Sequence, residues 1–333
     1  MWMRMLQKKE TGFDAALLKR AGIAKDLYFI INPAAQNNRS LKIWKKVETR
    51  LLAENIAYQA FHTQDKGHAK QITIDILSKT DRETTIIAVG GDGTLHEVIN
   101  GAAGYPHGII ACIPAGSGND YVRGIQQTNS QKDALSLILS QSEKRISKVD
   151  IGYLETQETK GFFINSFGIG IDAEITYDVN HSASKKWFNF FKIGKLVYIY
   201  SFLKKLFTYR RTDMTVTIDG RKHIFRKVWF IVVSNQSYFG GGIKISPRSE
   251  YEDGRFNLIA VHDIPHIKLL FVFLTVLWGG HLRLKNVSSF LGREMEITSD
   301  KPVRIQADGE IVGNSKVYAA IAPYKMRILS KEP

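Results

Sequence analysis

The run Gly90-Gly91-Asp92-Gly93-Thr94 is the feature that most constrains how this chain folds. It follows the apolar run 85–89, which is typical of a buried strand, and leads into a helical pattern that begins at Thr94. Glycines allow a tight turn whose backbone N–H groups approach an anion, and a helix N-terminus favours negative charge. The run therefore predicts a strand, a phosphate-binding loop and a helix. Because Asp92 would repel a bare phosphate, the loop suggests a metal-bound nucleotide.

A second glycine-rich loop strengthens this interpretation, since an isolated Gly-Asp-Gly is also typical of an ordinary tight turn. Residues 114–120 read Pro-Ala-Gly-Ser-Gly-Asn-Asp and follow the apolar run 109–113. The ends of neighbouring parallel strands meet at one edge of a sheet, where open α/β sheets bind their ligands. We therefore expect the two loops to lie side by side.

Strand-like and helix-like patterns alternate in the first half of the chain, which predicts an α/β domain with a doubly wound parallel sheet. The expected strands are 27–32, 57–63, 84–89 and 109–113, and the expected helices are 41–51, 69–78 and the one opened by Thr94.

From about residue 149 the strand patterns become shorter, which predicts a mostly antiparallel, β-rich domain. Its expected strands are 161–167, 214–219, 228–234, 256–262, 295–298 and 317–322, with helices at 193–207 and 267–277. The predicted organisation is thus an N-terminal extension over residues 1–25, a nucleotide-binding α/β domain over 26–148 and a β-rich C-terminal domain over 149–333.

Composition narrows the class of protein. The 333 residues are long enough for about two domains. The single cysteine, Cys112, rules out an internal disulfide framework and favours an intracellular protein. The N-terminal 25 residues lack the apolar core of a secretory signal, and the apolar run 267–280 is too short to span a bilayer.

A formal net charge of +14 calls for an acidic partner. Lysines, arginines and aromatic residues alternate over 185–195 and again over 204–211. Such interleaving suits an anionic membrane surface, and it suits single-stranded nucleic acid nearly as well. An ordinary core helix with solvated ends is the third interpretation.

Five sequence blocks in a fixed order carry a resemblance to a known family. They are Ile31-Asn32-Pro33, the block 90–101, the block 114–120, Gly240-Gly241-Gly242 with Asp253-Gly254, and Asp308-Gly309-Glu310. The chain resembles the bacterial diacylglycerol kinase and lipid kinase family, which also includes sphingosine and ceramide kinases. The resemblance implies an NAD kinase-like α/β domain, a β-rich C-terminal domain and an active cleft between them.

The resemblance also implies a nucleotide site. Its expected residues are Asn32, Thr63, Gly90, Gly91, Asp92, Gly93, Thr94, Leu95, His96, Gly116 and Ser117. Thr63 is equally compatible with a plain strand end. The family tends to have Ser or Gly with nearby basic residues after Asn-Pro, whereas residues 34–39 read Ala-Ala-Gln-Asn-Asn-Arg, so this phosphate contact departs from the family pattern, although Arg39 could still screen charge.

Candidate residues for the metal and the base complete the predicted site. Asp92 and Asp120 are the best carboxylates for Mg²⁺ because each follows a strand beside a phosphate loop, although Asp120 also suits a helix cap. By resemblance alone, a second metal site maps to Glu250, Asp253 and Arg255, the last through its main chain. The same resemblance implies Glu310 as the base that accepts the proton of the acceptor hydroxyl, with Asp308 orienting it or assisting with the metal.

We therefore expect an ATP-dependent, Mg²⁺-requiring lipid kinase that converts diacylglycerol to phosphatidic acid. Its expected partner is a lipid substrate at an anionic membrane surface and not nucleic acid, and self-association into a homodimer is left open. The expected location is cytoplasmic, at the inner face of the cell membrane. Two alternatives remain: an NAD kinase-like enzyme, which shares Gly-Gly-Asp-Gly-Thr, and a catalytically silent, nucleotide-binding membrane adaptor.

Overall fold

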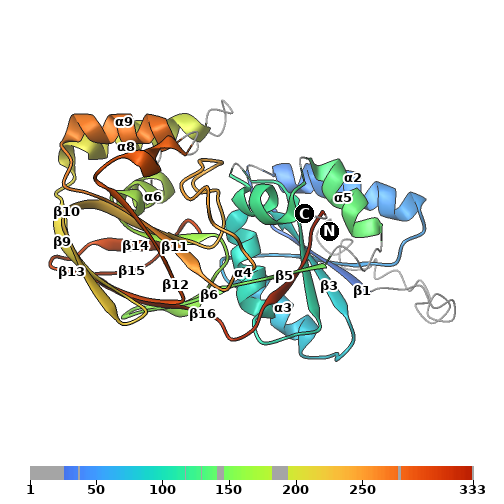
Figure 1. Ribbon diagram of the computed structural model, residues 1–333. Coiled ribbons are helices and arrows are strands. Elements are labelled where there is room, and N and C mark those ends of the chain that lie inside the picture. The colour runs from blue at the N-terminus through green and yellow to red at the C-terminus, as the bar shows by residue number, and fades with distance from the viewer. Residues whose placement is uncertain are drawn as a thin grey trace.

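The computed structural model describes residues 26–36, 38–116, 118–128, 130–140, 146–181, 194–276 and 279–331. They form two domains that lie side by side, an α/β domain and a β-rich domain (Figure 1). The predicted fold class is confirmed. The expected extension over residues 1–25 lies outside the described residues.

A six-stranded sheet forms the centre of the first domain, in the order β2-β1-β3-β4-β17-β5. Strands β1 to β4 are parallel, and β5 is antiparallel to β17. The bounds are β1 (Asp26–Ile31), β2 (Gln59–His62), β3 (Thr84–Gly90), β4 (Gly108–Pro114), β5 (Ile146–Val149) and β17 (Met326–Leu329). Every residue of β3 and β4 is buried, because helices cover both faces of the sheet.

The helices of this domain divide between the two faces. Apolar residues of α2 (Arg39–Ala53) and α5 (Gln131–Leu139) pack on one face of the sheet, and those of α3 (His68–Leu77) and α4 (Asp92–Ala102) pack on the other. This arrangement is the predicted doubly wound sheet. A short π-helical turn, η2 (Val122–Gln126), follows the second glycine-rich loop.

The C-terminal strand returns to the first sheet. β17 lies between β4 and β5 and pairs with both, although a linear division at residue 149 assigns it to the second domain. Its four residues include buried Met326, Ile328 and Leu329. Apolar residues of this kind suit either sheet, so the local pattern does not specify which one the strand joins.

The second domain is built on an eleven-stranded sheet, in which the pairs are antiparallel. Its strands are β6 (Gly152–Thr156), β7 (Lys160–Phe163), β8 (Ser166–Gly170), β9 (Thr212–Ile218), β10 (Arg221–Ser234), β11 (Phe256–His262), β12 (Val287–Gly292), β13 (Glu294–Ser299), β14 (Arg304–Ala307), β15 (Glu310–Asn314) and β16 (Lys316–Ile321). The predicted strand 161–167 is in fact two strands, β7 and β8, and β10 begins earlier than the predicted 228–234.

Three helices cover one face of the second sheet: α6 (Ile171–His181), α8 (Gly194–Thr208) and α9 (His266–Val276). They bury Ile171, Phe202, Leu206 and Leu269 against strand residues such as Trp229. The 3₁₀ turn η4 (Gly280–Arg283) follows α9. The predicted helices 193–207 and 267–277 are therefore confirmed to within one residue at each end. No helix of the described residues is long and apolar enough to cross a bilayer.

A buried carboxylate near the start of α6 makes stability depend on pH. Asp172 is buried, its Oδ2 accepts a hydrogen bond from Gln306 at 3.3 Å, and its Oδ1 has no hydrogen-bond partner. Burial raises the pKa of Asp172 to about 7.

The folded state therefore binds this proton more tightly than the unfolded state, so stability falls as the pH rises from about 4 to about 7. Asp172→Asn removes that ionisation. The stability of the variant relative to the wild type is expected to rise by about 2 kcal/mol between pH 5 and pH 8, measured by urea unfolding. A constant difference across this range would contradict the assignment.

Candidate active site

Two glycine-rich loops meet at the carboxyl ends of β3 and β4. The N–H of Ala115 donates to the carbonyl of Gly90 at 2.7 Å. A methyl group at Gly116 would lie 2.6 Å from the Cα of Gly91, so only glycine permits this backbone contact. The predicted proximity of the loops is confirmed, and α4 begins within the first of them, at Asp92. Ser117, the hydroxyl donor expected in the second loop, lies outside the described residues.

The side chain of Asn32 fixes the first loop from a neighbouring strand end, and Thr63 lies at the next strand end. Asn32, directly after β1, donates from Nδ2 to the hydroxyl of Thr94 at 3.0 Å. The N–H of Thr63, directly after β2, donates to the carbonyl of Ile31 at 2.9 Å, so Thr63 lies at the same sheet edge. The helix begins at Asp92 rather than at the predicted Thr94. The Leu95 side chain is buried in the core, so only its main chain can face a ligand.

Asp92 lies in a strongly acidic environment at the start of α4. Its Oδ2 accepts a hydrogen bond from the N–H of Asn119 at 2.8 Å. Burial, together with the charges of Asp120 and Asp308, raises the pKa of Asp92 to about 7. A carboxylate in this position gains stability from a nearby cation.

Asp120 connects the second loop to the other domain. Its Oδ2 accepts a hydrogen bond from the N–H of Gly241 at 2.9 Å, and its Oδ1 pairs with Arg123 at 3.4 Å. Gly241 belongs to a turn in which three consecutive glycines have positive φ. Asp120 therefore holds a turn of the second domain against the second glycine-rich loop.

A tight turn of the second domain carries Asp308, Gly309 and Glu310. Asp308 and Gly309 have φ of 48° and 88° between β14 and β15, as expected for a two-residue hairpin loop. The buried Asp308 carboxylate accepts hydrogen bonds from the N–H groups of Ile164, Asn165 and Ser166, at 3.0, 2.9 and 3.2 Å. These three hydrogen bonds, together with a contact to the His96 ring, hold the turn in position.

Glu310 from the second domain reaches the first glycine-rich loop of the α/β domain. Its Oε1 lies 3.7 Å from the position that a Cβ would occupy on Gly93. Its Oε2 pairs with Nζ of Lys66 at 2.7 Å. The structure thus brings the candidate base to the N-terminus of α4, next to the two glycine loops.

Helix α4 also binds directly to the second domain. Nδ1 of His96 lies 3.0 Å from Oδ2 of Asp308. Asn100 donates to the carbonyl of Phe162 at 2.9 Å and accepts from its N–H at 2.8 Å. The His96 ring therefore contacts the hairpin of Asp308. The expected role of His96 in the nucleotide site stays a prediction.

Three residues at the site were not found from the sequence. Lys66 follows β2 in a polar segment, and nothing local marks it as a partner of Glu310. Glu97 accepts hydrogen bonds from the N–H groups of Gly67 and Ala69 and so fixes the start of α3. Asn100 was visible as part of the block 90–101, but its pairing with β7 joins residues 62 positions apart.

Two family models match consecutive parts of the chain. Residues 26–153 match the diacylglycerol kinase catalytic domain, and residues 165–330 match the YegS C-terminal NAD kinase beta sandwich-like domain. The chain belongs to the diacylglycerol kinase and lipid kinase family.

Relatives cover most of the length of this chain. The Bacillus subtilis protein named "Putative lipid kinase YtlR" is 28% identical over 306 residues, 90% of this chain and 98% of that protein. A Bacillus subtilis diacylglycerol kinase is 29% identical over 231 residues, 68% of this chain and 71% of that protein. A crystal structure described as a "putative diacylglycerol kinase" from Bacillus anthracis has a similar fold, with a TM-score of 0.71 and 21% identity over 92% of this chain and 97% of that chain.

The polar side chains at the glycine-loop edge fit a magnesium nucleotide better than a free metal ion. No cluster of three or more His, Cys, Asp or Glu side chains suited to a metal occurs among the described residues. Mg²⁺ bound with a nucleotide needs only one or two carboxylates, with phosphate oxygens and waters completing its shell. Asp92 suits this role, whereas the Asp120 carboxylate is already engaged by Arg123 and Gly241.

The turn that carries Glu250, Asp253 and Arg255 has contacts of its own. Oδ1 of Asp253 accepts a hydrogen bond from the N–H of Arg255 at 2.9 Å. Lys325 donates to the carbonyl of Glu252 at 2.6 Å, which places a cation at this turn. A second metal held by Glu250, Asp253 and Arg255 stays a prediction.

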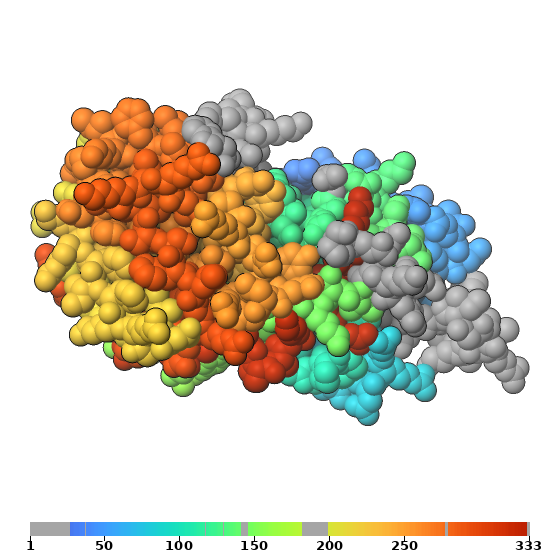
Figure 2. Space-filling view, viewed as in Figure 1, coloured from blue at the N-terminus to red at the C-terminus, as the bar shows by residue number. Residues whose placement is uncertain are grey.

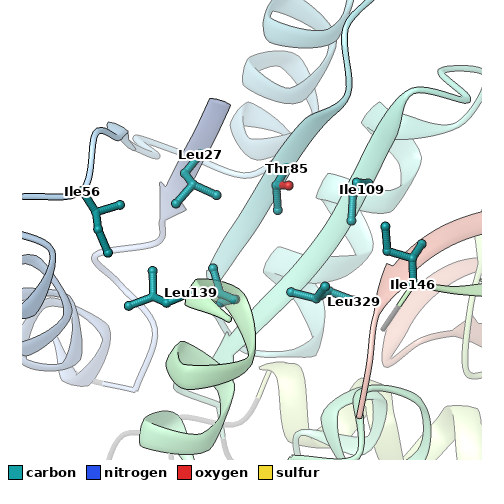
Figure 3. Close-up of a pocket in the computed structure, with 8 residues that line it drawn as sticks. Leu27, Ile56, Thr85, Ile109, Leu139, Ile146 and Leu329 are labelled. Atoms are coloured by element: carbon teal, nitrogen blue, oxygen red, sulfur yellow. The ribbon is translucent and has the colours of Figure 1, made fainter. Parts of the chain in front are cut away.

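A small apolar cavity of about 20 Å³ lies at the opposite edge of the first sheet (Figure 3). Leu27, Thr85 and Ile109, near the amino ends of their strands, contribute to its lining. It is too small for a nucleotide and offers no charged group. The glycine-loop edge is therefore the better candidate for the nucleotide.

Replacing Asp308 tests how the hairpin between β14 and β15 is positioned. Asp308→Asn places an amide donor against backbone N–H donors. The free energy of unfolding of the variant is therefore expected to be about 2–4 kcal/mol lower than that of the wild type. Urea unfolding measures the change, with the exposed Asp300→Asn as the matched control. Equal stability of the two variants would show that the buried contacts do not hold the turn.

Proposed function

We propose that the protein transfers the γ-phosphoryl group of ATP to the hydroxyl group of a lipid, with diacylglycerol as acceptor and phosphatidic acid as product. The observation that carries this proposal is the position of Glu310. A carboxylate from the second domain lies beside Gly93, at the helix N-terminus where the glycine loops meet. A nucleotide-binding protein without catalytic activity would not need a base at this point.

The proposed mechanism assigns a separate task to each part of the site. Backbone N–H groups of the two loops and the N-terminus of α4 bind the phosphates of ATP. Asp92 would hold Mg²⁺ together with the nucleotide, and that ion would offset the charge of the phosphates. The expected sites for the remaining nucleotide contacts are Asn32, Thr63 and Gly116.

Glu310 accepts the proton of the lipid hydroxyl as its oxygen attacks the γ-phosphorus. The bond between the γ-phosphorus and the oxygen that bridges it to the β-phosphate breaks, and ADP leaves with that oxygen. Asp308 keeps the hairpin in place during this step through its backbone contacts, so it is a positioning residue.

The choice of diacylglycerol rests on relatives that carry this name at 27–29% identity. The basic charge of the chain supports a substrate in an anionic membrane, approached from the cytoplasmic side. An NAD kinase-like activity is the second candidate, because the family model of the second domain is described as NAD kinase beta sandwich-like.

A lipid panel tests the proposed acceptor. The protein is incubated with γ-labelled ATP, Mg²⁺ and detergent micelles that contain diacylglycerol, phosphatidylglycerol, undecaprenol or a sphingoid base. We expect labelled phosphatidic acid in the first sample and at least about tenfold less product in the others. If only another lipid were labelled, that lipid would be the acceptor and the proposed reaction, phosphoryl transfer to a lipid, would stand. If no lipid were labelled in any sample, the proposed function would be wrong.

A further inference from the structure

The outer surfaces of α8 and α9 are apolar although both helices already bury their inner surfaces. Phe202 of α8 and Phe273 of α9 stack at a centroid distance of 4.4 Å, so the helices lie next to each other. Their outward residues are Ile199, Tyr200, Leu203 and Phe207 on α8, and Ile267, Leu270, Phe271 and Leu274 on α9. We call these eight residues the α8–α9 face.

The exposure of the α8–α9 face is unusually high for such side chains. Phe207 is 75% exposed, Ile267 is 72% exposed and Phe271 is 60% exposed. A helix that is apolar on all sides is normally covered by other protein or by lipid. In Figure 2 the orange residues of α9 form the outer edge of the second domain. A contiguous apolar surface of this kind marks an interaction site.

The charges around the face favour an anionic surface. Residues 194–211 contain five lysines and arginines and no acidic residue, and α9 contains Lys268 and no acidic residue. Lys204 and Lys205 pair with Asp178 of α6, whereas Arg210 and Lys268 are exposed and have no ion pair in the described part of the chain. Lys268 is exposed on the same side of α9 as Ile267 and Phe271. A protein partner with an apolar patch would not by itself require this one-sided charge.

A basic cavity lies at the C-terminal end of α8, directly after Phe207. It has a volume of about 430 Å³ and is lined in part by Lys205, Thr208, Arg210 and Lys301. Glu174 also lines it, but Lys205 pairs with this carboxylate at 2.8 Å and Arg304 pairs with it as well. Arg210 and Lys301 are exposed and form no ion pair within the described part of the chain.

We propose that the α8–α9 face inserts its apolar side chains into the surface of an anionic lipid bilayer and that the adjoining cavity receives the phosphate of a phospholipid headgroup. Aromatic and aliphatic side chains enter the boundary between headgroups and acyl chains, while Arg210 and Lys301 bind the phosphate. This deepens the proposed function and rests on it, because a lipid kinase must reach a hydroxyl at the membrane. It assigns membrane binding to a surface separate from Glu310 and the glycine loops.

Vesicle flotation without ATP tests the surface. The wild type is expected to bind vesicles of phosphatidylcholine with phosphatidylglycerol more tightly than vesicles of phosphatidylcholine alone. The double variant Phe207→Ser with Phe271→Ser is expected to lose at least about tenfold in partitioning to both kinds of vesicle. The double variant Arg210→Glu with Lys301→Glu is expected to lose the preference for phosphatidylglycerol while retaining binding to phosphatidylcholine.

Matched controls use residues of equal exposure on other surfaces. Leu52 on α2 is 64% exposed and Ile224 on β10 is 58% exposed, so Leu52→Ser with Ile224→Ser controls for lost apolar area. Lys222→Glu, on the exposed start of β10, controls for added negative charge. The proposal is wrong if the controls lose as much binding as the test variants, or if the test variants bind as the wild type does.

Two further readouts separate the possible results. Light scattering that shows a dimer, converted to a monomer by Phe207→Ser with Phe271→Ser, would overturn the proposal in favour of a second copy of this chain. Activity on a short-chain diacylglycerol dissolved as monomers is expected to be unchanged in all of these variants, because this substrate needs no lipid surface. Activity on this substrate without vesicle binding would reject only the α8–α9 face, whereas vesicle binding without transfer to any lipid would reject only the proposed function.

Discussion

Glu310→Gln is expected to lower kcat for lipid phosphorylation by at least about 100-fold while the affinity for ATP changes little. Glutamine keeps the size of the side chain but cannot accept the proton of the attacking hydroxyl. Glu310 projects from the hairpin of the second domain, and no backbone group of the glycine loops depends on it. The loss should therefore fall on the chemical step and not on binding.

Steady-state transfer to micellar diacylglycerol measures kcat, and calorimetric titration with ATP measures the affinity. Glu296→Gln is the matched control, because Glu296 is a half-exposed glutamate of the same domain that pairs with Lys316 at 3.0 Å. Lys66→Met shows whether the effect arises from the lost ion pair instead. If Glu310→Gln kept more than a tenth of the wild-type kcat, the assignment of the base would be wrong.

Asp92→Asn is expected to lower kcat by about 100-fold or more without destabilising the protein. The substitution removes the carboxylate that would hold Mg²⁺ with the nucleotide. It also removes a charge that burial and the neighbours Asp120 and Asp308 disfavour, while an asparagine oxygen can still accept the N–H of Asn119. Activity and stability should therefore change in opposite directions, as is common for groups retained for function.

Thermal unfolding at pH 8 and transfer assays over a range of Mg²⁺ concentrations measure the two effects. At this pH the Asp92 carboxyl is mostly ionised because its pKa is about 7, so the relief of repulsion is near its maximum. Asp75→Asn, at an exposed position of α3, is the control. A variant that loses stability but keeps its dependence on Mg²⁺ would contradict the proposed role.

Local sequence patterns predicted much of the first domain for physical reasons. Residues 86–89 of β3 and 109–113 of β4 are apolar because both faces of the sheet are covered, and a glycine-containing loop follows each run where Gly91 and Gly116 approach each other. The pairing of β17 with β4 could not be predicted in this way. It depends on which sheet edge is left open after the rest of the chain has folded.

The candidate site shows the same division between local and long-range information. Asp-Gly between two apolar segments predicts a hairpin, and the turn at Asp308 and Gly309 is one. Only the fold brings this hairpin to His96, and only the fold brings Lys66 to Glu310 across 244 positions. The sequence showed the aromatic and basic character of α8. The almost entirely apolar sequence of α9 is typical of a buried helix, so it did not reveal that the outer side of α9 is exposed.

A competition assay that follows the γ-phosphate of ATP in the presence of both candidate acceptors tests the central claim most directly. The protein is mixed with γ-labelled ATP, Mg²⁺, diacylglycerol micelles and NAD together, and the products are separated by chromatography. Transfer of the label to phosphatidic acid, absent in Glu310→Gln, is the predicted result. Label in a phosphorylated dinucleotide, or only in inorganic phosphate, would contradict a lipid kinase whose base is Glu310.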